Sequence, residues 1–274
     1  MRRAAVVTHG RAEQIGSGIA RLQKVAIDGG VELLFSDDDA GRHGLAGADD
    51  AALLTADIAV VLGGDGTMLR ALTRFLGAGI PVVGVNFGRV GFLSSVSRDQ
   101  LENGLARVFA GEYVVVELPT VEVAMGGRRH IAVNDVVVTS ATLGRMIELE
   151  WAVGGEAMGS VPCDGLICST PSGSTAYNLS NGGPVLMWGL DALATTFVAP
   201  HSLHARPVVV PRDKDILIWN RSADVAVAVL VDGHVVAQAA PADRIDVKLG
   251  DERSLLATLP EATFVSRYRE SFVG

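Results

Sequence analysis

A glycine-rich segment, residues 63–67 with the sequence GGDGT, constrains the fold of this chain more than any other feature. It directly follows residues 58–62 (IAVVL), a short apolar run with β-branched residues that predicts a buried strand. Residues 67–72 contain helix formers with apolar side chains spaced for one face. The glycines therefore lie at a turn from a strand to a helix, which is typical of layered α/β domains.

The same turn is suited to binding phosphate. Glycine tolerates positive φ and has no Cβ, so backbone amides can approach an oxygen-rich ligand, and the following helix N-terminus favours negative charge. Asp65 repels such a ligand unless its carboxylate binds a metal or accepts a proton, so its presence indicates chemistry. An ordinary turn, in which Asp bonds its own backbone, remains an alternative on these residues alone. The chain has neither a Walker A loop nor a G-x-G-x-x-G motif after a strand.

Composition predicts a soluble protein of two domains. The chain has 274 residues, of which 49% are hydrophobic and 20% charged. No apolar stretch approaches the roughly 20 residues of a membrane span, and the N-terminal apolar segment ends too early for a signal peptide, so we expect a cytoplasmic protein. The net charge of −8 argues against a nucleic-acid partner. Cys163 and Cys168 fit no zinc or thioredoxin spacing and are expected to be reduced and buried.

The first third of the chain alternates strands and helices. Strands are predicted over residues 3–8, 31–35, 58–62 and 81–85, and helices over residues 12–27 and 68–76. This order predicts an α/β domain with a mostly parallel, Rossmann-like sheet. Residues 36–50, which contain three consecutive aspartates, are expected to form a mobile acidic loop with solvated charges.

A second glycine-containing loop, residues 86–93, follows the last of these strands. Gly88 and Gly91 permit close approach of the backbone, and Arg89 offers a planar fork of donors. Since ligands bind beyond the carboxyl ends of parallel strands, we expect this loop and the GGDGT turn to face one cleft. A turn with a surface arginine is the alternative.

The pattern changes after Glu112. Short β-branched segments around Gly126 and Gly127 predict a hairpin, and later segments of the same kind predict a mostly β domain. We therefore expect an α/β domain over residues 1–98 and a mostly β domain over residues 99–257. The tail, about residues 258–274, is expected to pack back on the first domain.

Residues 164–184 form the densest polar segment of the chain. A strand is predicted to end at Thr170, and a short helix to begin near Ser174. Hydroxyl groups at a helix start commonly cap it, but one cap needs one side chain. This segment has more hydrogen-bonding side chains than a cap can use, and they suit a ligand rich in ring nitrogens and hydroxyls, such as a nucleotide. These side chains are Thr170, Ser172, Ser174, Thr175, Tyr177 and Asn178.

Two other groups of polar residues are candidates. Asn134 and Asp135 are adjacent in an apolar strand, where neighbours face opposite sides, so one of them needs a partner unless the strand ends there. His201 and His204 have a spacing compatible with metal binding, but a pair without a third ligand is usually structural. No direct protein ligation of a metal is predicted.

With these residues in view, the chain resembles the NAD kinase family over nearly its whole length. The GGDGT motif is shared with diacylglycerol kinases, sphingosine kinases and phosphofructokinases, and identifies only that superfamily. Residues 164–184 resemble the more specific family signature DG…STPTGSTAY…GGP, and residues 200–203 and 206–207 resemble its PHSL and RP segments.

This resemblance implies phosphorylation of the 2′-hydroxyl on the adenosine ribose of NAD, which gives NADP. It implies ATP or polyphosphate as donor, Mg²⁺ or another divalent cation, and a homodimer or homotetramer without nucleic-acid or membrane partners. Asp65 would approach the accepting hydroxyl and take its proton. The phosphate-binding residues would be Gly64, Gly66, Thr67 and Arg89.

The resemblance also implies an NAD site. Asn134 and Asp135 would bind ribose hydroxyls, and Ser172 and Thr175 the adenine. The remaining residues would lie near the nicotinamide half, often at a subunit interface, or flank the cleft; they are Asp164, Ala176, Tyr177 and His201.

Several positions depart from the family pattern. Asp135 stands where Glu is common, and Ser172 replaces the usual Thr but keeps the hydroxyl. Asn178, Phe87 and Arg89 also differ from the commoner residues. Two alternatives remain open: a kinase of the same superfamily that acts on a lipid or sugar, and a non-catalytic NAD sensor.

Overall fold

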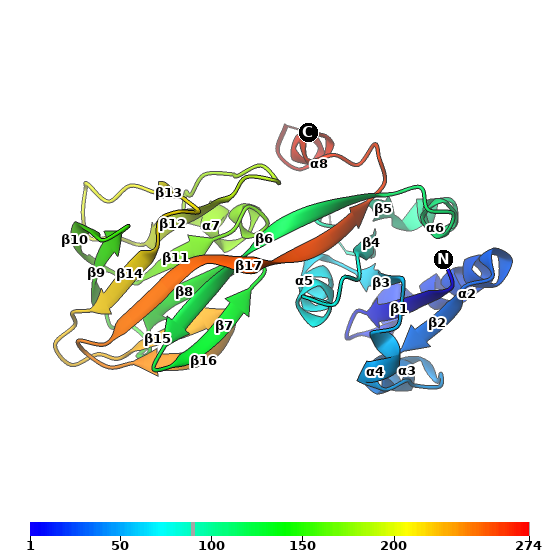
Figure 1. Ribbon diagram of the computed structural model, residues 1–274, viewed down its shortest axis with the longest axis horizontal. Coiled ribbons are helices and arrows are strands. Elements are labelled where there is room, and N and C mark those ends of the chain that lie inside the picture. Colours follow the sequence, from blue (N-terminus) through cyan, green and yellow to red (C-terminus); the bar gives the residue numbers. More distant parts are fainter. Residues whose placement is uncertain (89–90, 274) are drawn as a thin grey trace. The chain divides into compact units, whose positions relative to one another are not determined.

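The computed structural model describes residues 1–88 and 91–273, and these residues form two compact units (Figure 1). The first unit combines Met1–Glu117 with the C-terminal segment from Ser254 onward, and the second unit is Leu118–Arg253. The chain passes between the units within two long strands, β6 (Val114–Met125) and β17 (Arg244–Thr258). The expected combination of an α/β domain and a mostly β domain is confirmed.

A parallel sheet forms the centre of the first unit. Its four main strands follow the order β2-β1-β3-β4, and the end of β17 and the short β5 pair with β4. The bounds are β1 Arg3–Thr8, β2 Glu32–Phe35, β3 Ile58–Gly63, β4 Val82–Asn86 and β5 Val96–Ser97. All six residues of β3 are buried, as its apolar sequence predicts.

Short helices surround this sheet. They are α1 Ala12–Ile15, α2 Gly18–Gly29, α3 Asp37–His43, α4 Asp50–Leu53, α5 Asp65–Arg74, the 3₁₀ helix η1 Arg98–Gln100, α6 Leu101–Phe109, α8 Phe264–Tyr268 and the π-helix η3 Arg269–Val273. The single helix predicted over residues 12–27 is divided in two because Gly16 adopts a φ of +53°. Helix α5 begins at Asp65, three residues before its predicted start.

The prediction of a mobile acidic loop over residues 36–50 was wrong. Helix α3 begins there, because the Ser36 hydroxyl accepts a hydrogen bond from the Asp39 amide as an N-cap. Asp37, Asp38 and Asp39 occupy its first turn, where negative charge is favourable. Asp39 is also buried, with 3% of its surface exposed, so it does not belong to a solvated face.

Helix α6 belongs to the first unit, so the chain divides at Glu117 and Leu118 and not near residue 98. The physical reason is packing: Leu105 and Val108 of α6 share one buried cluster with Leu22 of α2. An ion pair between Arg21 and Glu102 joins the same two helices. On the C-terminal side the first unit resumes at Ser254.

Two sheets form the second unit. The six-stranded sheet has the order β13-β12-β11-β8-β15-β16, and β10-β9-β14-β17 with β6 and β7 form the other. One buried cluster contains Leu166 and Phe197 of the first of these sheets and Leu149 and Ile216 of the second, so the sheets pack face to face. The predicted hairpin is confirmed, because Met125 pairs with Arg128 across the two glycines.

The remaining elements of the second unit are short. The strands are β7 Arg128–Ala132, β8 Asp135–Ser140, β9 Ile147–Val153, β10 Glu156–Cys163, β11 Gly165–Ser169, β12 Ala192–Val198, β13 Val208–Pro211, β14 Ile216–Asn220, β15 Val227–Val231 and β16 His234–Ala239. The helices are η2 Gly173–Thr175 and α7 Tyr177–Ser180. Cys163 and Cys168 are free and buried. Across the part of the chain that the structure describes, no helix is long and apolar enough to cross a membrane.

Candidate active site

The GGDGT segment connects β3 directly to α5. Gly63 ends the strand and Asp65 begins the helix, with Gly64 as the N-cap. A Cβ on Gly63 would lie 2.5 Å from the Thr67 hydroxyl oxygen, so this corner requires glycine. A Cβ on Gly64 or Gly66 would meet no atom within 4 Å, so both face open space. The first turn of α5 therefore presents amide groups and a helix N-terminus to an approaching ligand.

Asp65 is held by the second glycine-containing loop. Its carboxylate accepts hydrogen bonds from the Phe92 amide at 2.7 Å and from the Leu93 amide at 3.1 Å. A Cβ on Gly91 would lie 2.5 Å from Asp65 Oδ1, which explains the glycine at that position. The two amides fix the orientation of a carboxylate that is only partly buried.

The two predicted glycine-containing loops lie side by side. Strands β3 and β4 are parallel neighbours, with Gly63 opposite Asn86. The Phe87 amide donates to the Gly63 carbonyl at 3.0 Å, and the Gly88 amide to the Asn86 side chain at 2.9 Å. Arg89, predicted as a phosphate contact, lies outside the described residues.

A residue that sequence reasoning missed supports this loop from the C-terminal segment. Arg267 is 4% exposed, and its Nη1 donates to the carbonyl oxygens of Phe92 at 2.7 Å and Ser94 at 2.6 Å. Burial lowers the pKa of Arg267 to about 10, so it stays charged at neutral pH. The Phe92 ring also packs edge-on against Phe264, with 5.2 Å between centroids. The only local signal in the sequence is a basic residue within an aromatic tail.

In the second unit, a turn between β7 and β8 presents Asn134. The amides of Val133 and Asn134 donate to the Asp232 carboxylate at 2.9 and 2.8 Å. The Asn134 side-chain oxygen accepts a hydrogen bond of 3.1 Å from the Ser172 hydroxyl. The structure thus brings together Asn134 and Ser172, which are 38 positions apart. Asp232 was not identified from the sequence, because it holds the turn at Asn134 through hydrogen bonds between residues far apart in the chain.

Asp135, next in the chain, points to the buried side. It is 7% exposed and begins β8, whereas Asn134 is half-buried and lies in the turn before that strand, so the alternative that a strand boundary separates the two polar residues is the correct one. Burial, and to a smaller extent the nearby Asp232 carboxylate, together raise the pKa of the Asp135 carboxyl to about 7. Asp135 is therefore close to its titration midpoint at neutral pH.

Much of the polar segment from Thr170 to Asn178 stabilises itself, which corrects the expectation that its surplus groups await a ligand. The Thr170 hydroxyl donates to the Val133 carbonyl at 2.7 Å, and the Ser174 hydroxyl to the Pro171 carbonyl at 2.8 Å. Buried Asn178 donates to the Ser174 carbonyl and accepts from Thr196. Ser172 is buried with its hydroxyl bonded to Asn134, Thr175 is half-buried, and Ala176 and Tyr177 are exposed.

Asp164 and His201 do not join this group within one chain. Asp164 precedes β11 and Thr170 follows it, so the length of a five-residue strand separates them. The Asp164 amide donates to the Val198 carbonyl at 3.0 Å, and the His201 amide to the Pro162 carbonyl at 2.8 Å. Both side chains are exposed. Within residues 1–88 and 91–273, no three His, Cys, Asp or Glu side chains form a metal-binding group.

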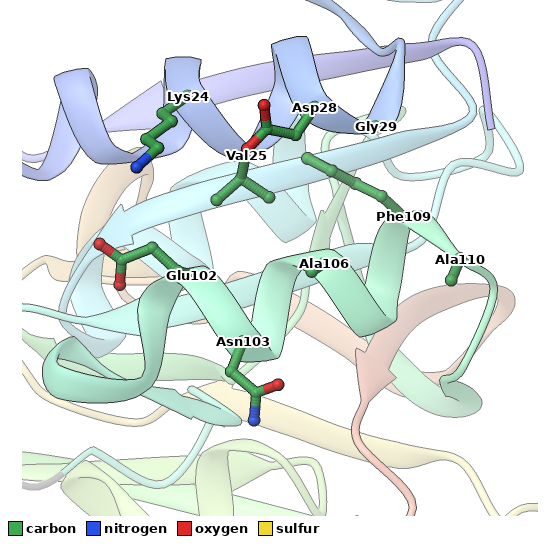
Figure 2. A pocket seen from close by; sticks show the side chains of 9 residues that line it. All are labelled: Lys24, Val25, Asp28, Gly29, Glu102, Asn103, Ala106, Phe109 and Ala110. Atoms are coloured by element: carbon green, nitrogen blue, oxygen red, sulfur yellow. The ribbon is translucent and has the colours of Figure 1, made fainter.

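A cavity of about 580 Å³ lies elsewhere in the first unit, between α2 and α6 (Figure 2). Lys24, Glu102 and Phe109 line it, and Figure 2 shows Lys24 and Glu102 at one end of it. It contains none of the residues predicted as site residues from the sequence.

Two family models match the chain. The ATP-NAD kinase N-terminal domain matches residues 43–113, and the ATP-NAD kinase C-terminal domain matches residues 133–259. A NAD kinase of Gemmatimonas aurantiaca is 39% identical over 219 residues, which cover 78% of this chain and 76% of that protein. A NAD kinase of Heliobacterium modesticaldum is 41% identical over 219 residues, covering 78% and 77%.

Two solved structures are similar. The yeast NADH kinase complexed with NADH has a TM-score of 0.87 and 20% identity, covering 100% of this chain and 88% of that one. The NAD kinase from Archaeoglobus fulgidus in complex with ATP has a TM-score of 0.77 and 26% identity, covering 99% and 97%. At this identity the yeast protein supports the fold alone.

Proposed function

This chain belongs to the NAD kinase family, and from that premise we propose which of its residues carry out the reaction. The enzyme phosphorylates NAD, and ATP as the donor is consistent with the ATP complex of the Archaeoglobus fulgidus relative. The observation that carries the proposal is the Asp65 carboxylate, which two amides orient beside an open glycine turn.

In the proposed mechanism, Asp65 is the general base. The ribose 2′-oxygen of NAD attacks the terminal phosphorus of the donor, the bond to the bridging oxygen breaks, and the shortened donor leaves with that electron pair. The proton of the 2′-hydroxyl passes to the Asp65 carboxylate. The amides of Gly64 and Gly66 bind the transferred group, because phosphoryl transfer depends on positioning and charge stabilisation. Thr67 belongs to the same phosphate-binding turn, and its own amide donates to the Gly64 carbonyl at 2.9 Å.

NAD binds to the second unit in this proposal. Asn134, whose side chain is linked to Ser172, and Asp135 bind the adenosine ribose, while Ser172 and Thr175 contact the adenine. Exposed Ala176, Tyr177, Asp164 and His201 contact the nicotinamide half or flank it. Asp164 and Thr170 lie at opposite ends of β11, so one copy of the chain does not bring Asp164 to the polar segment that follows the strand. The proposal therefore includes a homodimer or homotetramer, in which a second copy supplies some of the contacts to NAD.

The proposal includes a divalent cation such as Mg²⁺ on the phosphates of the donor. Mg²⁺ commonly binds through substrate phosphates and one or two carboxylates, and it keeps several waters. Asp65 is the nearest carboxylate to the glycine turn along the chain. Polyphosphate as an additional donor and a cytoplasmic location also belong to this proposal. No specific observation favours a lipid or sugar kinase or a non-catalytic NAD sensor.

The experiment is the Asp65→Asn variant. The amide keeps the size of the side chain but accepts a proton poorly, so we expect kcat to fall at least about 100-fold, with the KM for NAD nearly unchanged. A suitable control is Asp57→Asn. Asp57 also accepts two backbone amides, those of Arg2 and Arg3, but at the amino end of β1. A near wild-type rate of NADP formation by Asp65→Asn would refute the proposed base.

A further inference from the structure

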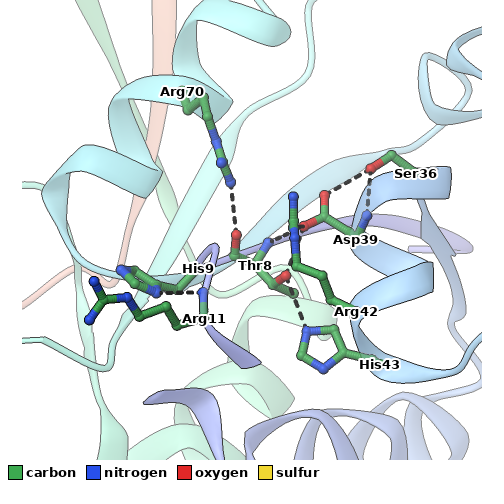
Figure 3. A network of polar contacts seen from close by, with 8 residues as sticks. All are labelled: Thr8, His9, Arg11, Ser36, Asp39, Arg42, His43 and Arg70. Carbon is green, nitrogen blue, oxygen red and sulfur yellow. Dashed lines mark hydrogen bonds and ion pairs between the residues drawn. The ribbon is translucent and has the colours of Figure 1, made fainter. Parts of the chain in front are cut away.

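A network of polar contacts at the carboxyl end of β1 has no role in the mechanism above (Figure 3). Its centre is Thr8, which is fully buried. The Asp39 carboxylate accepts hydrogen bonds from the Thr8 amide at 3.1 Å, the Thr8 hydroxyl at 2.7 Å and the Ser36 hydroxyl at 2.8 Å. These hydrogen bonds join the end of β1 to the start of α3.

Basic side chains from three segments lie around this junction of β1 and α3. We call them the Thr8 cluster; they are His9, Arg11, Arg42, His43 and Arg70. Arg70 of α5 donates to the Thr8 carbonyl at 2.8 Å, and Arg42 of α3 pairs with Asp39 at 2.6 Å. His43 Nε2 lies 3.2 Å from the Thr8 hydroxyl. Figure 3 shows Arg42, His43 and Arg70 reaching Thr8, while the Arg11 side chain extends past His9, away from Thr8.

The cluster carries a positive charge that its own network does not neutralise. Burial lowers the pKa of His43, so the charge comes from the three arginines, and Asp39 is the carboxylate within the drawn network. Arg11 and Arg70 are exposed, and the Arg42 side chain keeps 28% of its surface accessible. In a chain with a net charge of −8, such a concentration of guanidinium groups at one edge of the sheet favours an anionic ligand.

The strand order places the Thr8 cluster next to the glycine turn. In the order β2-β1-β3-β4, the glycine turn after β3 lies between two neighbours. On the β4 side, Asp65 bonds the loop at Phe92 and Leu93. On the β1 side, the His9 amide donates to the Leu62 carbonyl at 2.9 Å, so the Thr8 cluster directly adjoins the turn. The base and the cations thus flank the turn on opposite sides.

We propose that the Thr8 cluster binds the leaving-group phosphates of the phosphoryl donor, with Arg11, Arg42 and Arg70 as their ligands. The inference rests on the proposed function, since it takes the glycine turn as the place of the transferred group. The ligand class is a chain of linked phosphates, from a nucleoside triphosphate or from inorganic polyphosphate. Arginine suits it, because the guanidinium group binds phosphate oxygens with two donors and offsets the charge that develops on the leaving group.

The test is Arg70→Gln, assayed with ATP and with polyphosphate as donors. Loss of one charged contact should raise the KM of an accepted donor about tenfold, while the KM for NAD stays within about twofold. Arg11→Gln should act in the same direction. Both arginines are exposed, but Arg70 also donates to the carbonyl of buried Thr8, so the melting temperature of Arg70→Gln is measured beside its kinetics. The matched control is Arg74→Gln in the last turn of α5, where Arg74 pairs with Asp50; its donor KM should not change.

Inorganic tripolyphosphate provides a second measurement. It should inhibit competitively against ATP but not against NAD, and its inhibition constant should rise about tenfold in Arg70→Gln and stay unchanged in Arg74→Gln. An unchanged KM for both donors in Arg70→Gln and Arg11→Gln would overturn the inference, as would tripolyphosphate that competes only with NAD. An active Asp65→Asn variant would instead refute the proposed function, so the two failures are distinguishable.

Discussion

At the scale of single residues, two carboxylates of this chain differ in their surroundings. Asp65 lies at an open turn and accepts two amide hydrogen bonds. Asp135 is buried near another carboxylate, and its pKa is raised from 3.8 to about 7. Desolvation disfavours the ionised form, so ionising Asp135 costs free energy in the folded state. A buried carboxyl of this kind makes stability depend on pH.

We predict that Asp135→Asn stabilises the second unit at pH 8. The folded state binds the Asp135 proton more tightly than the unfolded state, so the cost of ionising it is fully present above pH 7 and is relieved as the pH falls toward 4. The asparagine cannot ionise, and we expect a gain on the order of 2–4 kcal/mol at pH 8 that shrinks with decreasing pH. Calorimetric melting of both proteins between pH 8 and pH 5 measures it. An equal difference at every pH would contradict the assignment.

At the scale of elements, the C-terminal helix α8 controls the orientation of Asp65 through an intermediate loop. Arg267 holds the carbonyl groups of Phe92 and Ser94, and the amides of Phe92 and Leu93 hold Asp65. Arg267 is therefore a positioning residue in this proposal, because it acts on the carboxylate only through the loop.

We predict that Arg267→Met lowers kcat about tenfold or more and leaves the KM for NAD nearly unchanged, because the base loses its orientation. Arg267→Lys, which keeps the charge and one donor, should restore part of the rate. Arg269→Met is the control, since Arg269 is exposed two positions further along. Rates are compared well below the melting temperature of each variant, because loss of buried hydrogen bonds also destabilises the protein. A KM effect without a kcat effect would exclude the positioning role.

The same elements show how far the sequence could predict this structure. The turn from β3 to α5 and the hairpin at Gly126 and Gly127 were predictable, since apolar runs and glycines act locally. Helix α3 was not, although Ser36 and Asp39 have the spacing of an N-terminal cap. A charge run says nothing about burial, and buried Asp39 bonds Thr8, which comes from another segment of the chain.

The sequence indicates residues of the proposed site that face open space, but it does not indicate the residues that support them. Asp65 stands out in the sequence because a carboxylate beside a phosphate-binding turn indicates chemistry, although no local pattern indicates the two amides of residues 92 and 93 that hold it. Ser174 and Asn178 looked equally available, yet their partners are the carbonyls of their own loop. Arg267 and Asp232 act on segments far away in the chain, and no local pattern indicates such contacts.

At the scale of the whole molecule, the two units differ in how the chain builds them. Every residue of the buried cluster of the second unit lies between Val121 and Leu249, within one continuous segment. The buried cluster of the first unit needs two segments, because it includes Ala257 and Leu259 beside residues such as Val60. The end of β17 also pairs with β4 through Leu256 and Val82. The second unit is therefore independent of the C-terminal segment, and the first is not.

We predict that a chain of residues 118–253 folds alone, melts cooperatively and binds NAD, but has no kinase activity because it lacks Asp65. A chain that ends at Arg253 should keep the melting transition of the second unit and lose that of the first, since it lacks Leu256, Ala257 and Leu259 of the sheet and core. Circular dichroism and calorimetry follow folding, and isothermal titration with NAD follows binding. If residues 118–253 fold but do not bind NAD, the dinucleotide site requires residues of the first unit, and the assignment of NAD binding to the second unit alone is wrong.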